Sequence, residues 1–422
     1  YFMEPKQQQK DILVIGFALF AMFFGAGNMI FPPHLGLETG NQWPLGFFSF
    51  TFADAGLALV AILALVTGSS DSLDGLLRRL GRVPALLLSS ACFLCIGPLL
   101  AIPRTAASTF ELAVQPSFSL GSVPFSFLYF ALVLALTLRP TKVIDIVGKI
   151  LTPALYVCLL ALIIKGVITP LGPLAETAAN GVFLSGLMSG YQTMDVIAAV
   201  VFIILIADTL NKRGYNKEEK TKITIFSGVI AALGLTIVYG GLTYLGATAS
   251  TLYGPEISQT ELLLSIVDHL LGNGGVLLLG VIVALACLTT ATGLTSAVAA
   301  YFARFIPQKR GYEILVVIIC LFSAVVSNFG ISTIVAFSGP VLNIVYPAIL
   351  VVILLSFFDK PIANDNVYRF SVGGALLASI FATLLPETAA VLPLESFGFG
   401  WLLPAAVCGV IGWFIKPKKQ SM

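Results

Sequence analysis

The chain has 422 residues, of which 58% are hydrophobic and only 10% are charged, and its formal net charge is +2. Soluble domains carry about 25% charged residues, so this composition excludes an ordinary soluble protein. The small net charge argues against a nucleic-acid partner. We expect a protein surrounded by the lipid bilayer, and nothing in the sequence indicates an obligate protein partner.

Apolar stretches of about 17 to 25 residues are long enough to cross a bilayer as helices. The sequence contains twelve such stretches, and they predict twelve transmembrane helices. Their approximate ranges are 11–37, 43–66, 83–107, 123–138, 142–168, 179–209, 220–249, 273–303, 312–328, 332–357, 369–386 and 397–415.

The placement of positive charge supports this count. If the N-terminus is cytoplasmic, all of the 23 basic residues except Arg104 and Lys165 fall on the cytoplasmic side, as the positive-inside rule expects. An error of one helix would reverse the side of every later loop. We therefore predict a multi-pass protein with both termini in the cytoplasm.

The first apolar stretch is interrupted in its middle by the residues GAGN (25–28), and Pro32 and Pro33 are expected to close it. Glycine is about 1 kcal/mol less favourable than alanine inside a helix, and asparagine prefers turns and caps. Loosened backbone at membrane depth survives only where protein or a water-filled cavity satisfies it. The interruption therefore predicts a polar site within the membrane.

The sixth stretch carries a second interruption, from Gly186 to Thr193, and Asp195 follows it. Paired interruptions at corresponding positions are typical of transporters built from inverted repeats. The alternative is that these glycines only let helices pack closely. The transporter interpretation predicts one transport domain with a first repeat over 11–168, an inverted second repeat over 179–357 and two additional helices over 369–415.

The eighth stretch carries hydroxyl side chains at Thr289, Thr292 and Ser296 beside a face of small residues. Oxygen ligands suit hard cations, which makes this stripe a candidate cation site. The alternative is that each hydroxyl bonds its own helix backbone. The six cysteines lie in apolar stretches and the two histidines are far apart, so we expect neither a transition-metal site nor a cofactor.

Three charged residues lie within apolar stretches. Asp54 falls near the middle of the second stretch, Asp195 follows the second interruption, and Arg104 lies toward the outer end of the third. Charges at membrane depth are costly and usually functional. Either acid could bind a cation, carry a proton or hold an amine, or could form a structural hydrogen bond. Arg104 is a gate candidate, although a snorkelling side chain would fit as well.

Four segments carry a resemblance to a known family. The segments GFALFAMFFGAGNMIFPPHLG (16–36), GPLLAIPRTA (97–106), GYQTMDVIAA (190–199) and CLTTATGLTSA (287–297) resemble those of the bacterial branched-chain amino acid–cation symporters. The resemblance implies uptake of leucine, isoleucine and valine, driven by Na⁺ or H⁺, across the bacterial plasma (inner) membrane. It also implies the LeuT-type fold, an all-α fold with two inverted five-helix repeats in which helices 1 and 6 are interrupted.

More distantly, GAGNMIFP (25–32) and ACLTT (286–290) resemble the first and eighth helices of the neurotransmitter–sodium symporters. The basic gate residue of those symporters has no counterpart here, which makes Arg104 a more interesting candidate. The resemblance also implies that the amides of Ala26 and Gly27 meet the substrate carboxylate. The implied Na⁺ ligands are the carbonyls of Ala21, Phe24 and Ala286 and the hydroxyls of Thr289 and Thr290.

These features together predict a branched-chain amino acid symporter that works by alternating access. Backbone at the two interruptions would hold the substrate ammonium, and apolar residues of the third and sixth stretches would take its side chain. The further substrate-binding candidates are Asn28, Ile96, Leu99, Gly186, Met188, Ser189, Gly190 and Tyr191.

Three other functions remain as alternatives. The first is a carrier of the same fold for another neutral amino acid, or one coupled to protons through Asp54 or Asp195. The second is a passive channel. The third is an intramembrane aspartyl enzyme, which would need Asp54 and Asp195 to share one site. Nothing in the sequence shows that these two residues meet, so we do not expect an enzyme.

Overall fold

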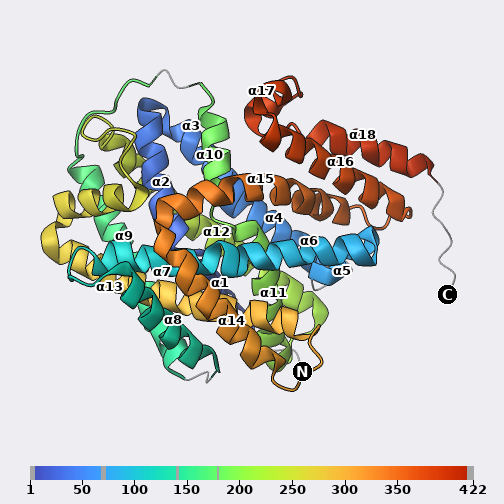
Figure 1. Cartoon of the computed structure of the whole chain (residues 1–422), viewed down its shortest axis with the longest axis horizontal. Coiled ribbons are helices and arrows are strands. Elements are labelled where there is room, and N and C mark those ends of the chain that lie inside the picture. The colour runs from blue at the N-terminus through green and yellow to red at the C-terminus, as the bar shows by residue number, and fades with distance from the viewer. Residues whose placement is uncertain (1–4, 68–72, 139–141, 178–179, 416–422) are drawn as a thin grey trace.

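The computed structural model describes residues 5–67, 73–138, 142–177 and 180–415, and this part of the chain contains helices and no strand. The helices form one bundle, with α16 and α18 packed together at the side opposite α9 (Figure 1). The elements of the first half are α1 Pro5–Phe23, α2 Ala26–Thr39, η1 Gly40–Gln42, α3 Trp43–Thr51, η2 Phe52–Gly56, α4 Leu57–Thr67, α5 Leu73–Leu77, η3 Arg78–Leu80, α6 Arg82–Leu94, η4 Cys95–Leu99, α7 Ala101–Thr109, η5 Phe110–Val114, α8 Ser122–Leu138 and α9 Lys142–Ile168.

The second half is also helical in its described residues. Its longest element, α13, bends where Gly272 adopts a φ of 68°, a value that favours glycine. The elements are α10 Val182–Tyr191, α11 Asp195–Lys212, α12 Lys217–Thr248, α13 Gln259–Ala303, α14 Gly311–Val326, η6 Ser327–Phe329, α15 Gly330–Ser356, α16 Asp365–Leu384, α17 Pro386–Ala389, η7 Glu395–Phe397 and α18 Leu402–Phe414.

The twelve predicted stretches all fall on helices of the described chain. Seven helical runs are long and apolar enough to span a membrane. Gly311–Ser356 covers the ninth and tenth predicted stretches, and Ala26–Thr67 covers the second stretch and the part of the first that follows the break. Three shorter apolar helices, Ser122–Leu138, Pro153–Ile168 and Leu402–Phe414, account for the rest. The two runs are long because adjoining helices follow each other without a gap.

The first and sixth stretches are both broken, as predicted, but the breaks are shorter than predicted, because residues 26–28 lie in α2 and residues 186–191 lie in α10. Phe24 and Gly25 separate α1 from α2, while Gln192 to Met194 separate α10 from α11. The expectation that Pro32 and Pro33 end the first stretch was wrong, because α2 continues through both to Thr39. Proline lacks an N–H donor, but membrane helices tolerate it where their surroundings satisfy the freed backbone groups.

Close packing against α12 holds α2 in place. A Cβ atom on Gly36 would lie 1.9 Å from the carbonyl oxygen of Thr243, and one on Gly246 would lie 1.8 Å from that of Pro33. No other residue type fits at either position. Small residues that let helix backbones approach are the usual device for joining helices in a membrane.

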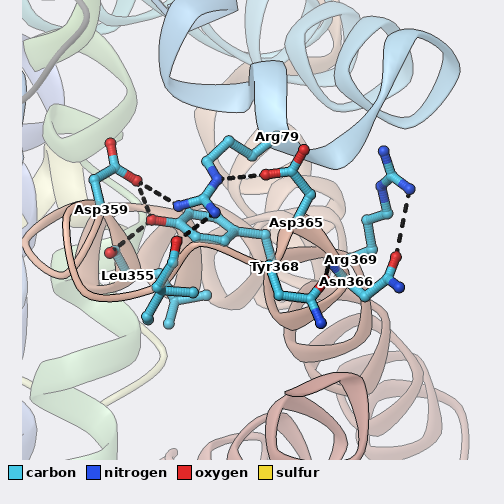
Figure 2. Close-up of polar contacts among 9 residues, drawn as sticks. Arg79, Leu355, Asp359, Asp365, Asn366, Tyr368 and Arg369 are labelled. Carbon is cyan, nitrogen blue, oxygen red and sulfur yellow. Dashed lines mark hydrogen bonds and ion pairs between the residues drawn. The ribbon is translucent and has the colours of Figure 1, made fainter. Parts of the chain in front are cut away.

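One end of the bundle is held by a group of polar contacts around Arg79, between η3 and the junction of α15 with α16 (Figure 2). The guanidinium of Arg79 donates to Asp365 at 2.7 Å, to Asp359 at 3.0 Å and to the carbonyl oxygen of Ile362 at 2.5 Å. It also lies 4.2 Å from the ring centroid of Tyr368, whose hydroxyl bonds Asp359. We call these five residues the Arg79 cluster.

Candidate functional site

The break between α1 and α2 leaves backbone groups available. Asn28 turns its side-chain oxygen back to accept the Gly25 N–H at 3.2 Å. The first N–H groups of any α-helix lack partners within the helix, and for Ala26 and Gly27 the described residues supply none. These two amides therefore mark the positive end of α2.

The break between α10 and α11 is formed by polar and strained residues. Met194 adopts a φ of 65°, which is costly for a residue with a Cβ atom and is often found at functional sites. Asp195 then begins α11, where the helix dipole favours a negative charge.

A hydrogen-bonded network joins the two breaks. The side-chain amide of Asn28 donates to Asp195 Oδ2 at 3.0 Å and to the Tyr239 hydroxyl at 2.5 Å. The hydroxyl of Thr193 lies 2.7 Å from Asp54 Oδ1. All five side chains are at most 6% exposed, so each carries the full cost of losing water.

Asp54 lies in η2, a π-helical turn between α3 and α4, and such turns are frequent at functional sites. The carboxyl groups of Asp54 and Asp195 lie close enough to interact with each other electrostatically. Nothing in the sequence showed that these two residues meet, and the structure brings them together. Their helices are far apart in sequence and only tertiary packing brings them together.

Arg104 is the positive charge nearest this network. It follows a π-helical turn, η4, in which Gly97 leaves the helical conformation and Pro98 lacks a donor. Its guanidinium donates to the Gln192 carbonyl oxygen at 2.6 Å and lies 5.5 Å from the ring centroid of Phe31. Among the described residues, no carboxylate lies within the 4.0 Å of an ion pair from Arg104.

A cavity of about 50 Å³ lies between the two breaks. Its walls combine apolar side chains with the opposite charges of Arg104 and Asp195. The lining residues are Met22, Phe23, Gly25, Ala26, Asn28, Ile96, Ala101, Arg104, Thr105, Thr193, Met194, Asp195, Ala198, Phe202, Thr290 and Leu294.

The structure distributes the predicted substrate residues unevenly. Ala26, Asn28 and Ile96 line the cavity, and a Cβ atom on Gly27 would lie 3.1 Å from Arg104 Nη2. Leu99 packs against the apolar core instead.

The candidates on α10 lie outside the cavity lining. A Cβ atom on Gly186 would lie 2.0 Å from Ser49 Oγ, and one on Gly190 would lie 2.6 Å from Ala53 Cβ. These glycines therefore pack α10 against α3 and η2. Ser189 is partly exposed, and the remaining two candidates contact other elements: Met188 lies toward Gly398, and Tyr191 stacks on Tyr346 with ring centroids 4.4 Å apart.

The predicted Na⁺ ligands are also divided. Thr290 lines the cavity, whereas Ala21, Phe24, Ala286 and Thr289 do not. The Thr289 hydroxyl donates to the Ala286 carbonyl oxygen at 2.8 Å, so these two candidate ligands contact each other. A threonine oxygen keeps lone pairs after donating.

Sequence reasoning missed Tyr239 and did not single out Thr193. Tyr239 lies in the seventh stretch, where a tyrosine at membrane depth requires a partner for its hydroxyl. That requirement was the available signal, but it does not identify the partner.

Two solved structures share this fold. A Na⁺-coupled sialic acid symporter aligns with a TM-score of 0.63 at 14% identity, covering 97% of this chain and 91% of that chain. MhsT in complex with L-phenylalanine aligns with a TM-score of 0.60 at 19% identity, covering 94% and 97%. The fold is therefore that of the LeuT-type transporters.

The family follows from sequence. The model of the branched-chain amino acid transport protein family matches residues 8–419, and the chain belongs to this family. The branched-chain amino acid permease BraB of Bacillus subtilis is 38% identical, with 97% of each chain covered. The permease BrnQ of Escherichia coli is 36% identical, covering 97% of this chain and 96% of its own. The relatives are permeases, and the chain is a transporter rather than an enzyme.

Proposed function

We propose that this protein is a secondary active symporter that takes up leucine, isoleucine and valine together with a monovalent cation, Na⁺ or H⁺. The observation that supports this proposal most directly is the cavity between two helix breaks, lined by both Arg104 and Asp195. An amino acid is a zwitterion, and these side chains offer a counter-charge to each of its ends. The names of the related permeases support the same substrate class.

The substrate carboxylate would bind the guanidinium of Arg104 and the amides of Ala26 and Gly27. Its ammonium would bind Asp195 and the carbonyls freed by the breaks. The candidates Gly186, Met188, Ser189, Gly190 and Tyr191 would then act mainly by holding α10 in place.

The side chain of the substrate would lie among apolar residues such as Phe23, Ile96 and Phe202, which line the cavity. An apolar pocket separates substrates that differ by one methylene by only about 1–3 kcal/mol, which suits a carrier for all three branched-chain amino acids. A cavity of about 50 Å³ holds little more than water. Binding leucine therefore requires the surrounding helices to move apart, as alternating access demands.

The cation would link the moving parts of the protein. One candidate site is the Na⁺ set of Ala21, Phe24, Ala286, Thr289 and Thr290, which would join the first break to α13. The other is the pair of acids, Asp54 and Asp195. Either ion would drive uptake by favouring one state of a shared conformational equilibrium.

The membrane orientation is part of the proposal. We place both termini in the cytoplasm of a bacterial plasma (inner) membrane, because the basic residues then gather inside. The repeats would cover 11–168 and 179–357, with two additional helices over 369–415. The Arg79 cluster then lies at the cytoplasmic end.

Concentrative uptake of radiolabelled leucine into proteoliposomes tests the function. We expect accumulation when a Na⁺ gradient or a pH gradient is imposed, and competition by isoleucine and valine but not by lysine. Thr289→Ala should weaken Na⁺-driven uptake about tenfold if Na⁺ is the coupled ion, because it removes an oxygen ligand. Leucine flux that never exceeds its gradient would contradict the symporter and leave a channel.

A further inference from the structure

Asp54 has fewer hydrogen-bond donors than an ionised carboxylate needs. Its side chain is 0% exposed. Oδ1 lies 2.7 Å from the Thr193 hydroxyl, whereas Oδ2 is buried and accepts no hydrogen bond from the described residues, although the Tyr239 hydroxyl is a further donor near this carboxyl. An ionised carboxylate offers about four acceptor positions, and burying it with so few donors is costly.

The hydroxyl of Thr193 has one hydrogen to donate and two acceptors within hydrogen-bonding distance. Its oxygen lies 2.6 Å from the Gly190 carbonyl oxygen as well as 2.7 Å from Asp54 Oδ1. If Asp54 were ionised, these two acceptors would compete for one hydrogen. A protonated Asp54 resolves the competition, since it donates to Thr193 while Thr193 donates to Gly190.

The charges around the cavity do not balance without a further cation. Asp54 and Asp195 supply two negative charges within reach of each other, and Arg104 supplies one positive charge. An unbalanced charge at membrane depth is unfavourable, and adjacent carboxyls avoid being ionised together. The titratable or charged groups that interact with this pair from the surrounding helices are Arg104 on α7, Tyr239 on α12 and Tyr346 on α15; behind them, Cys287 on α13 interacts with Arg104, and Tyr191 on α10 with Tyr346.

A bound amino acid leaves the same imbalance. Its carboxylate pairs with Arg104 and its ammonium with Asp195, so that both of these charges are balanced. Asp54 is then the one ionisable group of the acid pair without a counter-charge. A proton on Asp54 makes the loaded site neutral, and it fits the hydrogen-bond positions described above.

We propose that Asp54 carries a proton when the site closes around its substrate, and that this proton is the coupling ion of the transporter. This inference rests on the proposed function and specifies its cation. The O–H bond of the Asp54 carboxyl breaks when the site opens to the cytoplasm. The proton passes to water and the carboxylate is solvated. The substrate-free protein returns with Asp54 ionised, and a proton from the outer side reloads the group in the next cycle.

The experiment uses the full chain in proteoliposomes that contain a trapped pH-sensitive dye. Labelled leucine uptake and internal acidification are recorded together. We expect about one proton to enter with each leucine, with or without Na⁺. Asp54→Asn should lower pH-driven accumulation at least tenfold and abolish acidification, while exchange of internal for external leucine remains measurable. The matched control is Asp268→Asn, an exposed acid on α13, which should acidify like the wild type.

The outcomes separate this inference from the proposed function. Leucine accumulation that requires Na⁺ and brings no acidification would overturn the proton assignment and leave the symporter intact. Acidification that persists in Asp54→Asn would overturn the role of Asp54. If the wild type neither accumulates nor exchanges leucine, the proposed function fails and this inference fails with it. Should Asp54→Asn not fold, the proton-to-leucine ratio of the wild type still decides.

Discussion

Two buried or half-buried arginines meet opposite surroundings in this protein. Arg79 bonds two carboxylates and a carbonyl oxygen and lies over a tyrosine ring (Figure 2). Arg104 bonds one carbonyl oxygen and lies near a phenylalanine ring. Two carboxylates of the protein itself balance the charge of Arg79. Arg104 has no carboxylate within ion-pair distance among the described residues.

Like Arg79, other charged groups at the ends of the helices have partners within the protein. Asp11 bonds Arg213 at 2.8 Å and accepts from Tyr215 at 2.7 Å. Burial, with a further effect of that hydrogen bond, raises the pKa of Tyr215 to about 12, so its hydroxyl remains a donor at any physiological pH. Charged groups whose hydrogen bonds are all made within the protein hold helices together. Charged groups that lack such partners remain able to bind a ligand.

The largest effect should follow from removing the charge of Arg104. Arg104→Gln takes away the proposed partner of the substrate carboxylate, and losing one member of a buried charged pair costs about 2–5 kcal/mol. We expect leucine binding, measured by scintillation proximity, to weaken about a hundredfold or more. Arg104→Lys should lie between, because it keeps the charge and loses the planar fork.

Arg82→Gln provides the matched control for that prediction, since Arg82 is exposed at the start of α6. It should leave leucine affinity unchanged. Equal leucine affinities in Arg104→Gln and the wild type would show that Arg104 has a structural role, as Arg79 does, and does not bind the substrate.

Changing Arg79 should affect stability rather than substrate affinity. Arg79→Ala leaves Asp359 and Asp365 without their shared arginine, and hydrogen bonds to charged groups contribute about 1.5–3 kcal/mol each. Since the site is partly open to solvent, we expect a loss of about 2 kcal/mol and a lower unfolding temperature in detergent, with leucine affinity nearly unchanged.

Arg369→Ala is the control, because the one polar side-chain contact of Arg369 among the described residues is a weak one with Asn366, at 3.4 Å (Figure 2). Its unfolding temperature should stay close to that of the wild type. If both variants lose the same stability, the ion pairs of the Arg79 cluster contribute nothing specific.

A smaller effect is expected at Thr193. Thr193→Val removes the oxygen that we expect to accept the proton of Asp54, at a cost of about 1 kcal/mol. The midpoint of the pH dependence of leucine uptake should then move by about half to one pH unit toward lower pH. Thr137→Val is the control, because that buried hydroxyl bonds only the Val133 carbonyl oxygen of its own helix. A shift toward higher pH would mean that Thr193 donates to an ionised Asp54.

The sequence predicts the helix breaks well and their contents less well. Glycine, alanine and asparagine at 25–28 weaken a helix wherever it lies, so the first break could be located from local chemistry alone. Gly186 and Gly190 weaken α10 in the same way, yet their neighbours show that they serve packing against α3 and η2. A glycine that frees backbone and one that admits a neighbouring helix look alike in sequence.

The meeting of Asp54 with Asp195 depends on tertiary packing. Each acid could be identified as unusual by its depth in an apolar stretch. Their proximity requires η2 to lie against α11, and no periodicity within either segment contains that information. The same holds for Tyr239, which reaches Asn28 from α12.

The smallest predicted effect concerns Asp74 on α5, which pairs with Arg304 just beyond α13. The hydrogen bond from Arg304 lowers the pKa of Asp74, against the opposing effect of partial burial. A pKa that is lower in the folded protein means that the pair stabilises it above the unfolded value of about 3.9, and that this contribution disappears as the pH falls through the folded value.

Both side chains are more than 40% exposed, so solvent limits the contribution to about 0.5 kcal/mol. We expect Asp74→Asn to unfold slightly below the wild type at pH 7, and the difference to shrink as the pH is lowered toward 3. Unfolding temperatures across this range provide the measurement. A large difference, or one that does not change with pH, would contradict this prediction. It would mean that Asp74 resembles the charged cavity residues and not the paired groups at the helix ends.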